Sequence, residues 1–469
     1  RLMNRYVTAI LIALSTTGTA QTLQPAPKLV VNITIDQLRT DYIEAFAPLY
    51  GPDGFKKLLE GGRIYEGASY SFTPIDRASA IASIYTGTTP YYNNIVGTLW
   101  LDRNTLRPVY CVDDAKTGSS PAQLSTSTIG DELKVATNGA AIVYALAPSR
   151  DAAVLAAGHA ADGAVWIDDK QGVLTTSRYY KDKARKWLDA YNSVYSQRTT
   201  DEGSKNLAIA LAAQNCITEN AMGRDEVTDL LAITLSAKGR NATNWQTDME
   251  SVYRRLDKLI ADLIGGIERK VGKDNVLFMV TSTGYTDEEI VDYSKYNIPT
   301  GTFYINRTAN LLNMFLGAIY GQGKYVETCF HNEIYLSHKL FEQKRVGLSE
   351  VLGRCQEFLI QNSGVRDVYT SDRLLTGNND IQKIRLGHHP AISGDIIVEV
   401  APGWQLYNED NQEKYTSRAS FVPFPIIFYG AGTKAERIHT PVVVDRIAPT
   451  IAKSIRIRAP NACKAEPLF

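Results

Sequence analysis

The chain has 469 residues, and its 50 basic and 50 acidic side chains leave no net charge. This length exceeds what one hydrophobic core usually organises, so we expect one large α/β domain with insertions, or two domains. The charge balance excludes a global basic field for nucleic acid and an acidic tail. The five cysteines lie far apart without a C-x-x-C pair, which indicates scattered structural cysteines, with or without one disulfide.

The N-terminus has the pattern of a secretory signal over residues 1–20. Arg1 and Arg5 flank a short apolar run at 7–14, and Gly-Thr-Ala at 18–20 fits a small-residue cleavage site. The alternative is a membrane anchor, but the run is short for a bilayer core of about 30 Å. We therefore expect an exported protein, periplasmic or outer-membrane associated, without a transmembrane segment in the mature chain.

A polar linker at 21–28 precedes the first predicted strand. The run 29–35 is rich in β-branched residues and suits a buried parallel strand, which places Asp36 at its C-terminal end. In open α/β sheets, ligands bind at that edge. The following stretch, 41–62, reads as a helix, a Gly/Pro break and a second helix that ends in glycine.

Apolar segments continue along the chain in the same alternating manner. The stretch 247–270 has apolar residues at helical spacing and predicts a long helix that faces the core. The remaining buried runs predict strands at 139–147, 153–158, 227–236, 275–284 and 425–432.

Strands that alternate with helices predict an α/β fold with a mainly parallel sheet and helices on both faces. Residues 300–400 have a different, α+β character, and we interpret them as an inserted cap subdomain. The core then consists of a first part, 29–299, and a last part, 401–469.

Several motifs occur in the order in which they stand in one known family. They are VVNITIDQLRTDYI, DGFKKLLEGG, ASIYTGTTP, NNIVGTLWLDR, VYCVDD, AGHAADGAVWIDD, PFPIIFYGAG and VVVDRIAPTIAKSI. From about Leu29 to the C-terminus, the chain resembles the alkaline phosphatase superfamily. The most similar branch is the exported phosphate-irrepressible type, which is akin to type I phosphodiesterases and nucleotide pyrophosphatases.

The resemblance implies a site with two zinc ions. Two metal ions about 4 Å apart clamp a phosphate, one activating the attacking hydroxyl and the other stabilising the leaving oxygen. Asp and His side chains hold the metals, and a Thr or Ser is the nucleophile. Asp36 matches the first family ligand.

The phosphate-binding positions of the family do not match. Counting back from Tyr85-Thr86-Gly87, Arg77 stands at the nucleophile position, and an arginine cannot be deprotonated to attack phosphorus. Thr98 replaces a phosphate-binding Asn. Ser149 and Asp151 stand where some members have a Lys-x-Arg pair, so those positive charges are lost.

The remaining ligand positions also differ from the family. Lys238 stands near an expected Asp, and Asn241 or Ala242 near an expected His. Gly284 and Tyr285 replace an Asp-His pair. The last family His is missing, since the sequence has no histidine between His389 and His439.

Other polar residues are candidates to replace the missing metal ligands. His331 with His338, and the adjacent His388-His389, lack the i, i+4 spacing of helical metal ligands, while His159 matches a scaffold segment. The acidic run 287–289 reads as a solvated helix N-terminus.

Three hydroxyls near the turn, Thr73, Ser79 and Ser83, are weak nucleophiles without a metal or a base. Asp76 is either a general acid or the ion-pair partner of Arg77, and we favour the ion pair.

We therefore predict an exported pseudoenzyme without a metal cofactor. Its degenerate pocket would comprise Asp36, Asp76, Arg77, Thr98, Lys238, Arg240, Gly284 and Tyr285. Fixed positive charge from Arg77, Lys238 and Arg240 would bind a small anion, or would only neutralise Asp36.

Two further functions remain as alternatives. One is an interaction subunit of an envelope complex, which the 26 tyrosines favour because Tyr is common at interfaces. The other is a zinc-dependent phosphomonoesterase or phosphodiesterase with a rearranged site. No pattern indicates a nucleic-acid partner.

Overall fold

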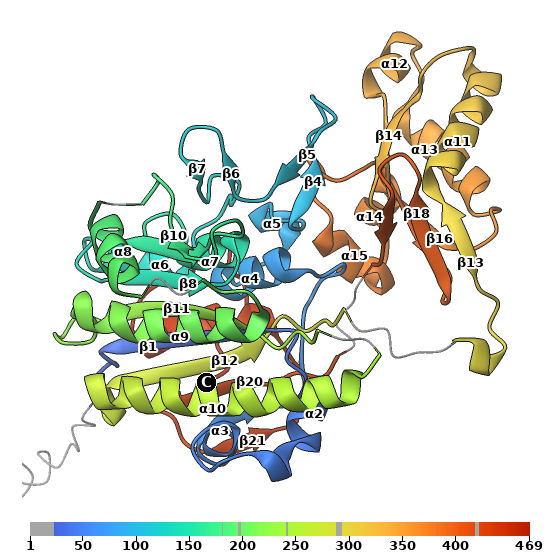
Figure 1. The fold of residues 1–469 in the computed structure, drawn as a ribbon. Coiled ribbons are helices and arrows are strands. Elements are labelled where there is room, and N and C mark those ends of the chain that lie inside the picture. The colour runs from blue at the N-terminus through green and yellow to red at the C-terminus, as the bar shows by residue number, and fades with distance from the viewer. Residues whose placement is uncertain (1–22, 181, 196–197, 241–242, 288–292, 418–421) are drawn as a thin grey trace, which may run out of the picture.

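The computed structural model describes residues 23–180, 182–195, 198–240, 243–287, 293–417 and 422–469. Its main element is a nine-stranded mixed sheet (Figure 1). In spatial order the strands are β10 (Leu174–Thr175), β9 (Gly163–Ile167), β8 (Val143–Ala147), β11 (Asp229–Ser236), β1 (Leu29–Asp36), β12 (Val276–Ser282), β20 (Ile426–Gly430), β2 (Arg63–Tyr65) and β21 (Glu436–Ile438). This arrangement confirms the predicted α/β class.

The centre of the sheet is parallel. Strands β9, β8, β11, β1 and β12 all run the same way, whereas β20 is antiparallel to β12. In the register, Asp36 of β1 lies beside Ser236 of β11, and Ile35 lies beside Ser282 of β12. The carboxyl ends of three strands therefore meet around Asp36.

Helices cover both faces of this sheet, so β1 is buried along its whole length. Val31, Ile33 and Ile35 face one core, and Val30 faces the other. The first face carries α2 (Thr40–Ala45), α3 (Phe55–Gly61), α8 (Asp182–Val194), α9 (Glu202–Glu219) and α10 (Trp245–Val271). The second carries α4 (Arg77–Thr86), α6 (Ile129–Ala136), α7 (Arg150–Ala157) and α16 (Ile447–Ser454). The predicted helix at 247–270 is confirmed as α10.

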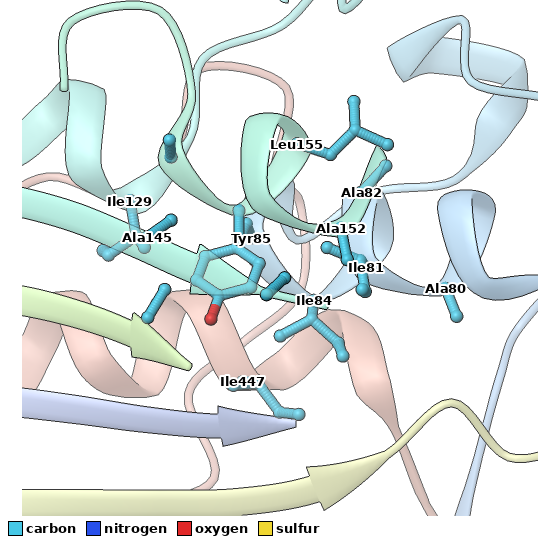
Figure 2. Packing of buried hydrophobic residues seen from close by; sticks show 14 of the residues in the cluster. Ala80, Ile81, Ala82, Ile84, Tyr85, Ile129, Ala145, Ala152, Leu155 and Ile447 are labelled. Atoms are coloured by element: carbon cyan, nitrogen blue, oxygen red, sulfur yellow. The ribbon is translucent and has the colours of Figure 1, made fainter. Parts of the chain in front are cut away.

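Helix α4 is central to the second face. Its Tyr85 lies among side chains of α6, β8, α7 and α16, including Ile129, Ala145, Ala152 and Ile447 (Figure 2). All of residues 78–86 are buried. This packing fixes the helix whose first residue is Arg77.

The strand predicted at 153–158 is wrong. These residues belong to α7, which is buried from Asp151 to Ala157. A short, uniformly apolar run does not separate a buried helix from a buried strand, and alanine favours the helix. The next strand is β9, which begins only at Gly163.

A second layer of structure, the cap, follows β12 in sequence and lies to one side of the main sheet (Figure 1). It contains a three-stranded sheet with β13 (Gly301–Tyr304), β18 (Trp404–Asn408) and β19 (Glu413–Tyr415). Its four-stranded sheet has β14 (Val326–Phe330), β15 (Glu333–Leu336), β17 (Ile396–Val400) and β16 (Val365–Thr370). Helices α11 (Ile305–Tyr320), α12 (His338–Gln343) and α13 (Leu348–Leu359) complete it. The cap has its own hydrophobic core, and β18 and β19 lie in the stretch that we assigned to the main core.

Short elements connect the two layers. The hairpin of β4 (Leu99–Leu101) and β5 (Pro108–Tyr110) stands between the sheet and the cap, with α5 (Pro90–Asn93) beneath it (Figure 1). The smaller hairpin of β6 (Asp113–Asp114) and β7 (Gly118–Ser119) follows. Helices α14 (Ser371–Thr376) and α15 (Gln382–Gly387) lie near the cap. Strand β22 (Val442–Val443) pairs with β3 (Ala68–Ser69).

All five cysteines are free thiols. In the part of the chain that the structure describes, no helix combines the length and the apolar character that crossing a bilayer requires. The predicted signal, 1–20, lies outside the described residues.

Candidate functional site

A cavity of about 1150 Å³ opens where the strand ends meet. Asp36, Ser236 and Tyr285 contribute to its wall from the ends of β1, β11 and the segment after β12. The lining is densely charged and balanced. Its basic residues are Arg77, Arg150, Lys170, Arg178, Arg185, Lys205 and Lys238, and its acidic residues are Asp36, Asp151, Asp168, Asp169, Asp189, Glu202 and Asp287.

Asp36 is buried at the end of β1, with a relative exposure of 5%. The Thr283 hydroxyl donates a hydrogen bond to Asp36 Oδ1 over 2.7 Å, and the backbone N–H of Gln37 donates to the same hydroxyl oxygen over 2.9 Å. Burial raises the pKa of Asp36, although Arg77 and Thr283 oppose the shift. One oxygen of this carboxyl is therefore bonded to Thr283, and the other faces Arg77.

Arg77 is the first residue of α4 and forms a two-pronged ion pair. Its Nε and Nη2 each donate to Asp151 over 2.9 Å, while its Nη1 lies 3.9 Å from Asp36 Oδ2. The Tyr110 hydroxyl also donates to Asp151 over 2.7 Å. Planar, bidentate pairs of this kind are the strongest charge-assisted hydrogen bonds. The Arg77 guanidinium is thus held by carboxylates of the cavity wall.

The electrostatics of this pair follow from its burial. Asp151 is 0% exposed at the start of α7, and the Arg77 side chain is 32% exposed. Burial works against both charges, but mutual attraction outweighs it, so the pKa of Arg77 rises and the pKa of Asp151 falls. With Asp36 close by, two carboxyl groups surround one guanidinium, so the centre offers no surplus positive charge.

Asp76 has a different role from the one that we favoured. Its Oδ1 accepts the backbone N–H of Ser79 over 3.0 Å and caps α4. Its Oδ2 accepts the backbone N–H and the hydroxyl of Thr98 over 2.6 and 2.9 Å. The predicted Asp76–Arg77 ion pair is therefore wrong, because Arg77 turns to Asp151. Among the described lining residues of the cavity, neither Asp76 nor Thr98 occurs.

The two basic residues after β11, Lys238 and Arg240, lie in different surroundings. Lys238 lines the cavity and pairs with Asp287, with its Nζ 3.5 Å from Oδ2. Arg240 instead lines a smaller cavity of about 360 Å³ between α9 and α10, and its Nη1 lies 3.4 Å from Asp201 Oδ2. The structure thus brings Lys238 to the cavity of Asp36 and Arg77, and places Arg240 elsewhere. Asn241 and Ala242 lie outside the described residues.

Gly284 and Tyr285 follow β12. Gly284 has a φ of 72°, and a Cβ there would stand 2.8 Å from Phe424 and 2.9 Å from Tyr70, so the position requires glycine. Tyr285 lines the cavity beside Asp36 and Arg77. Burial raises the pKa of its hydroxyl, so Tyr285 is a neutral group at ordinary pH.

The histidines that we weighed as metal ligands bind protein groups. His159 Nδ1 lies 2.7 Å from Asp131, and His338 Nε2 lies 2.6 Å from Asp395. His388 Nε2 lies 3.1 Å from the carbonyl of Gly394. Within the described ranges, no three His, Cys, Asp or Glu side chains stand close enough together to hold a metal ion.

The donor set around Asp36 does not fit two zinc ions. Zinc needs three or four Cys, His or carboxylate ligands, often with their orientation fixed by further hydrogen bonds. Of the described residues that line the cavity, none is a His or a Cys. Asp36 accepts a hydrogen bond from Thr283, and the Arg77 guanidinium lies beside it where a second metal ion would need an anionic ligand. The described residues of the cavity therefore do not fit a metal-assisted reaction.

The sequence did not predict two residues that are bonded together with Arg77, namely Asp151 and Tyr110. By the family resemblance, Asp151 stands only as the replacement of a lost cation. A signal for the pair was present, because an arginine and a carboxylate that both depart from the family pattern carry complementary charges.

Comparison with known proteins agrees with this fold. The family model for type I phosphodiesterase / nucleotide pyrophosphatase matches residues 30–420. Alkaline phosphatase PafA of Elizabethkingia meningoseptica is 25% identical over 515 residues, covering 95% of this chain and 94% of the relative. Alkaline phosphatase PhoV of Synechococcus elongatus is 26% identical over 508 residues, covering 93% and 91%.

A solved structure gives the same picture of the architecture. The crystal structure of wild-type alkaline phosphatase PafA superposes with a TM-score of 0.83 at 24% identity, covering 95% of this chain and 99% of that one. The match extends over both the sheet and the cap. The chain belongs to the type I phosphodiesterase / nucleotide pyrophosphatase family and has the alkaline phosphatase-like fold.

Proposed function

We propose that this chain is a pseudoenzyme of its family, a protein that keeps the phosphatase fold but does not hydrolyse phosphate esters. The bidentate Arg77–Asp151 pair is the observation that carries the proposal. A nucleophile must lose a proton to attack phosphorus, and a guanidinium does not do so in a protein. The neighbouring Ser79 hydroxyl donates to Asp76, whose carboxylate already caps α4 and accepts from Thr98.

Two cavity features support a non-catalytic role without metal. Lys238 and Gly284–Tyr285 stand where the family resemblance expects ligands, and none of these side chains is a zinc donor at neutral pH. Asp36 alone would hold zinc too weakly to matter. The same features count against the rearranged zinc hydrolase.

Of the two non-catalytic roles, we favour an interaction protein of the cell envelope over a simple anion-binding protein. The cavity lining has equal numbers of acidic and basic residues, and Arg77 is already neutralised. By contrast, α11 on the cap exposes Leu311 at 52% and Met314 at 69%. Exposed apolar side chains on one helix face are typical of contact surfaces.

Export remains part of the proposal. The N-terminal pattern of a charged start, a short apolar run and small residues supports it. N-terminal sequencing of the mature protein and cell fractionation test it. We expect cleavage after Ala20 and recovery from the periplasm or the outer membrane. A mature chain that retains residues 1–20 in the cytosol would contradict export.

The decisive experiment measures hydrolysis of an aryl phosphate and bound zinc on the same preparation. We expect no turnover by the wild-type chain, with or without added Zn²⁺, and no stoichiometric zinc by elemental analysis. Arg77→Thr alone should remain inactive, because the ligands are still missing. Turnover by the wild-type chain that depends on Zn²⁺ and disappears in Asp36→Asn would overturn the proposal.

A restoration series sharpens this result. Arg77→Thr combined with Lys238→Asp, Gly284→Asp and Tyr285→His returns several family ligands at once. Zinc uptake by this variant, but not by Arg77→Thr, would show that the missing ligands rather than the scaffold limit the site. Gly284→Asp alone is the control for folding, because a side chain at Gly284 meets Phe424 and Tyr70.

A further inference from the structure

The β4–β5 hairpin connects the cavity to the cap. At its core end, Tyr110 donates to Asp151 beside the cavity. At its other end, Leu101 packs with Phe330 and Tyr335 of the cap. Arg103 also reaches the cap, where Nη2 donates to the carbonyl of Ser393 over 2.6 Å and lies 3.3 Å from Asp395. Figure 1 shows the hairpin standing between the two layers.

His331 bridges the same boundary from the cap side. It occupies the turn between β14 and β15, and its φ of 52° is a left-handed backbone conformation in which histidine occurs more often than most residues. Its Nδ1 lies 2.5 Å from Glu413 Oε1, and its Nε2 lies 3.3 Å from the carbonyl oxygen of Leu99 on the hairpin. One side chain of the turn therefore contacts both the cap and the hairpin.

Both partners of this imidazole are acceptors. A carbonyl oxygen has no proton to donate, and an ionised carboxylate has none either. A neutral histidine carries one N–H, so it can satisfy Glu413 or Leu99 but not both. Only the imidazolium, with a proton on each nitrogen, donates to both at once.

The surroundings also favour the cation. The ring stacks on Tyr415, with centroids 4.8 Å apart, and touches the ring of Phe330. Glu413 on β19 and Glu333 on β15 are the charged groups that act on it, and both are acidic. Arg103, the nearby cation of the hairpin, is bound to Asp395 and Ser393.

We propose that His331 is a proton-operated latch between the cap and the β4–β5 hairpin, closed while the imidazole carries both protons and weakened when one is lost. The hydrogen bond to the Leu99 carbonyl is the one given up, because the short bond to the Glu413 carboxylate retains the remaining proton. The Leu101, Phe330 and Tyr335 contact and the Arg103 bonds then hold the hairpin without it.

The pH direction follows from the environment. Burial lowers the pKa of His331, but the hydrogen bond and charge of Glu413 outweigh it, so the folded-state pKa is raised above the ordinary value of 6.5. A raised folded pKa means that the stabilisation is complete below pH 6.5 and is lost as pH rises through the folded value. The latch is therefore closed in mild acid and opens in alkali.

Hydrogen exchange on the full chain tests the latch. We would follow peptides covering 99–110 at about pH 5.5 and about pH 8.5, values that bracket histidine titration, and correct them for the intrinsic exchange rate. We expect protection of the hairpin to fall roughly tenfold between the two, the size of effect that one charged hydrogen bond gives. Peptides from β1 should keep their protection.

Matched variants separate His331 from its neighbours. His331→Gln should remove the pH dependence in 99–110. His338→Gln should leave it in place, because His338 bonds to Asp395 within the cap and does not touch the hairpin. His439→Gln is the surface control, since His439 is 78% exposed and pairs with Glu66 at the far edge of the sheet.

A second measurement keeps the test valid if His331→Gln does not fold. The ring proton signals of His331 can be titrated by NMR in the wild-type chain, with Glu413→Gln as the perturbing variant. We expect the His331 midpoint to lie above the ordinary histidine value of 6.5 and to fall in Glu413→Gln. A midpoint that Glu413→Gln leaves unchanged, or hairpin exchange that is the same at both pH values, would overturn the latch.

Discussion

Two paired residues of the β4–β5 hairpin, Tyr110 and its cross-strand partner Leu99, lie beside different cationic partners. At the cavity, Tyr110 joins an ion pair between Arg77 and Asp151, and a guanidinium keeps its charge at every pH that a cell reaches. At the cap, His331 contacts the Leu99 carbonyl, and, although burial opposes the shift, Glu413 raises the pKa of its ring. The ion pair at Arg77 therefore keeps its charge, whereas the proposed latch at the cap depends on a proton.

This difference indicates where change is tolerated in the molecule. The Arg77–Asp151 pair lies at the start of α7. Its two charged residues can be replaced only together, because either partner alone would be an uncompensated charge. The cap contact lies at a boundary between two hydrophobic cores, where the loss of one hydrogen bond leaves both cores intact. The predictions below test this contrast.

The largest effect is expected from Asp151→Ala. It leaves the buried Arg77 guanidinium without its carboxylate, and breaking a buried pair in this way costs about 3–5 kcal/mol in the free energy of unfolding. Urea denaturation measures the loss. The double variant Arg77→Met with Asp151→Leu should recover most of it, because it removes both charges. A loss as large in the double variant would mean that packing, not charge, sets the stability there.

Asp229 is a buried carboxyl group that is bonded to backbone N–H groups, and it serves as the reference for Asp151. Asp229 is 2% exposed and accepts backbone N–H groups of Ile142 and Gly223 over 2.7 and 2.8 Å, and burial raises its pKa from 3.8 to about 6. Because the folded state binds this proton more tightly, stability should fall by about 2–3 kcal/mol as pH rises from 4 to 6. Asp229→Asn should flatten this part of the stability profile. An unchanged profile in Asp229→Asn would show that Asp229 titrates normally.

The smallest effect is expected from Tyr110→Phe. This change removes the hydroxyl that donates to Asp151 but keeps the Arg77 pair, so we expect a loss of about 1 kcal/mol. Tyr296→Phe, at a side chain that is 70% exposed, should change stability by less than about 0.5 kcal/mol. A Tyr110→Phe loss as large as that of Asp151→Ala would mean that the hydroxyl, rather than the guanidinium, holds the carboxylate.

The sequence contained enough information for the central strands of the main sheet, but not for β9, β10, β2 and β21. The apolar runs at β1, β12 and β20 predicted buried strands, and helical spacing predicted α10, because a buried element must be apolar along its length. The same signal failed for α7, whose alanine-rich run is buried on all sides. Uniform burial removes the periodicity that distinguishes the two structures.

The partners within the site were less predictable. Asp151 lies 74 residues from Arg77, and the contacts of His331 span 82 and 232 residues. Local pattern carries no information on such pairs. The motif order placed Asp36, Arg77, Lys238 and Tyr285 on one cavity, but Arg240 leaves it because the loop after β11 turns toward α9.

The position of β1 has a consequence for biosynthesis. This N-terminal strand pairs with β11 and β12, whose residues begin at 229 and 276. Strand β1 therefore cannot pair on both edges until residues up to 282 have been synthesised. Contacts between such distant segments form slowly and leave the nascent chain prone to aggregation.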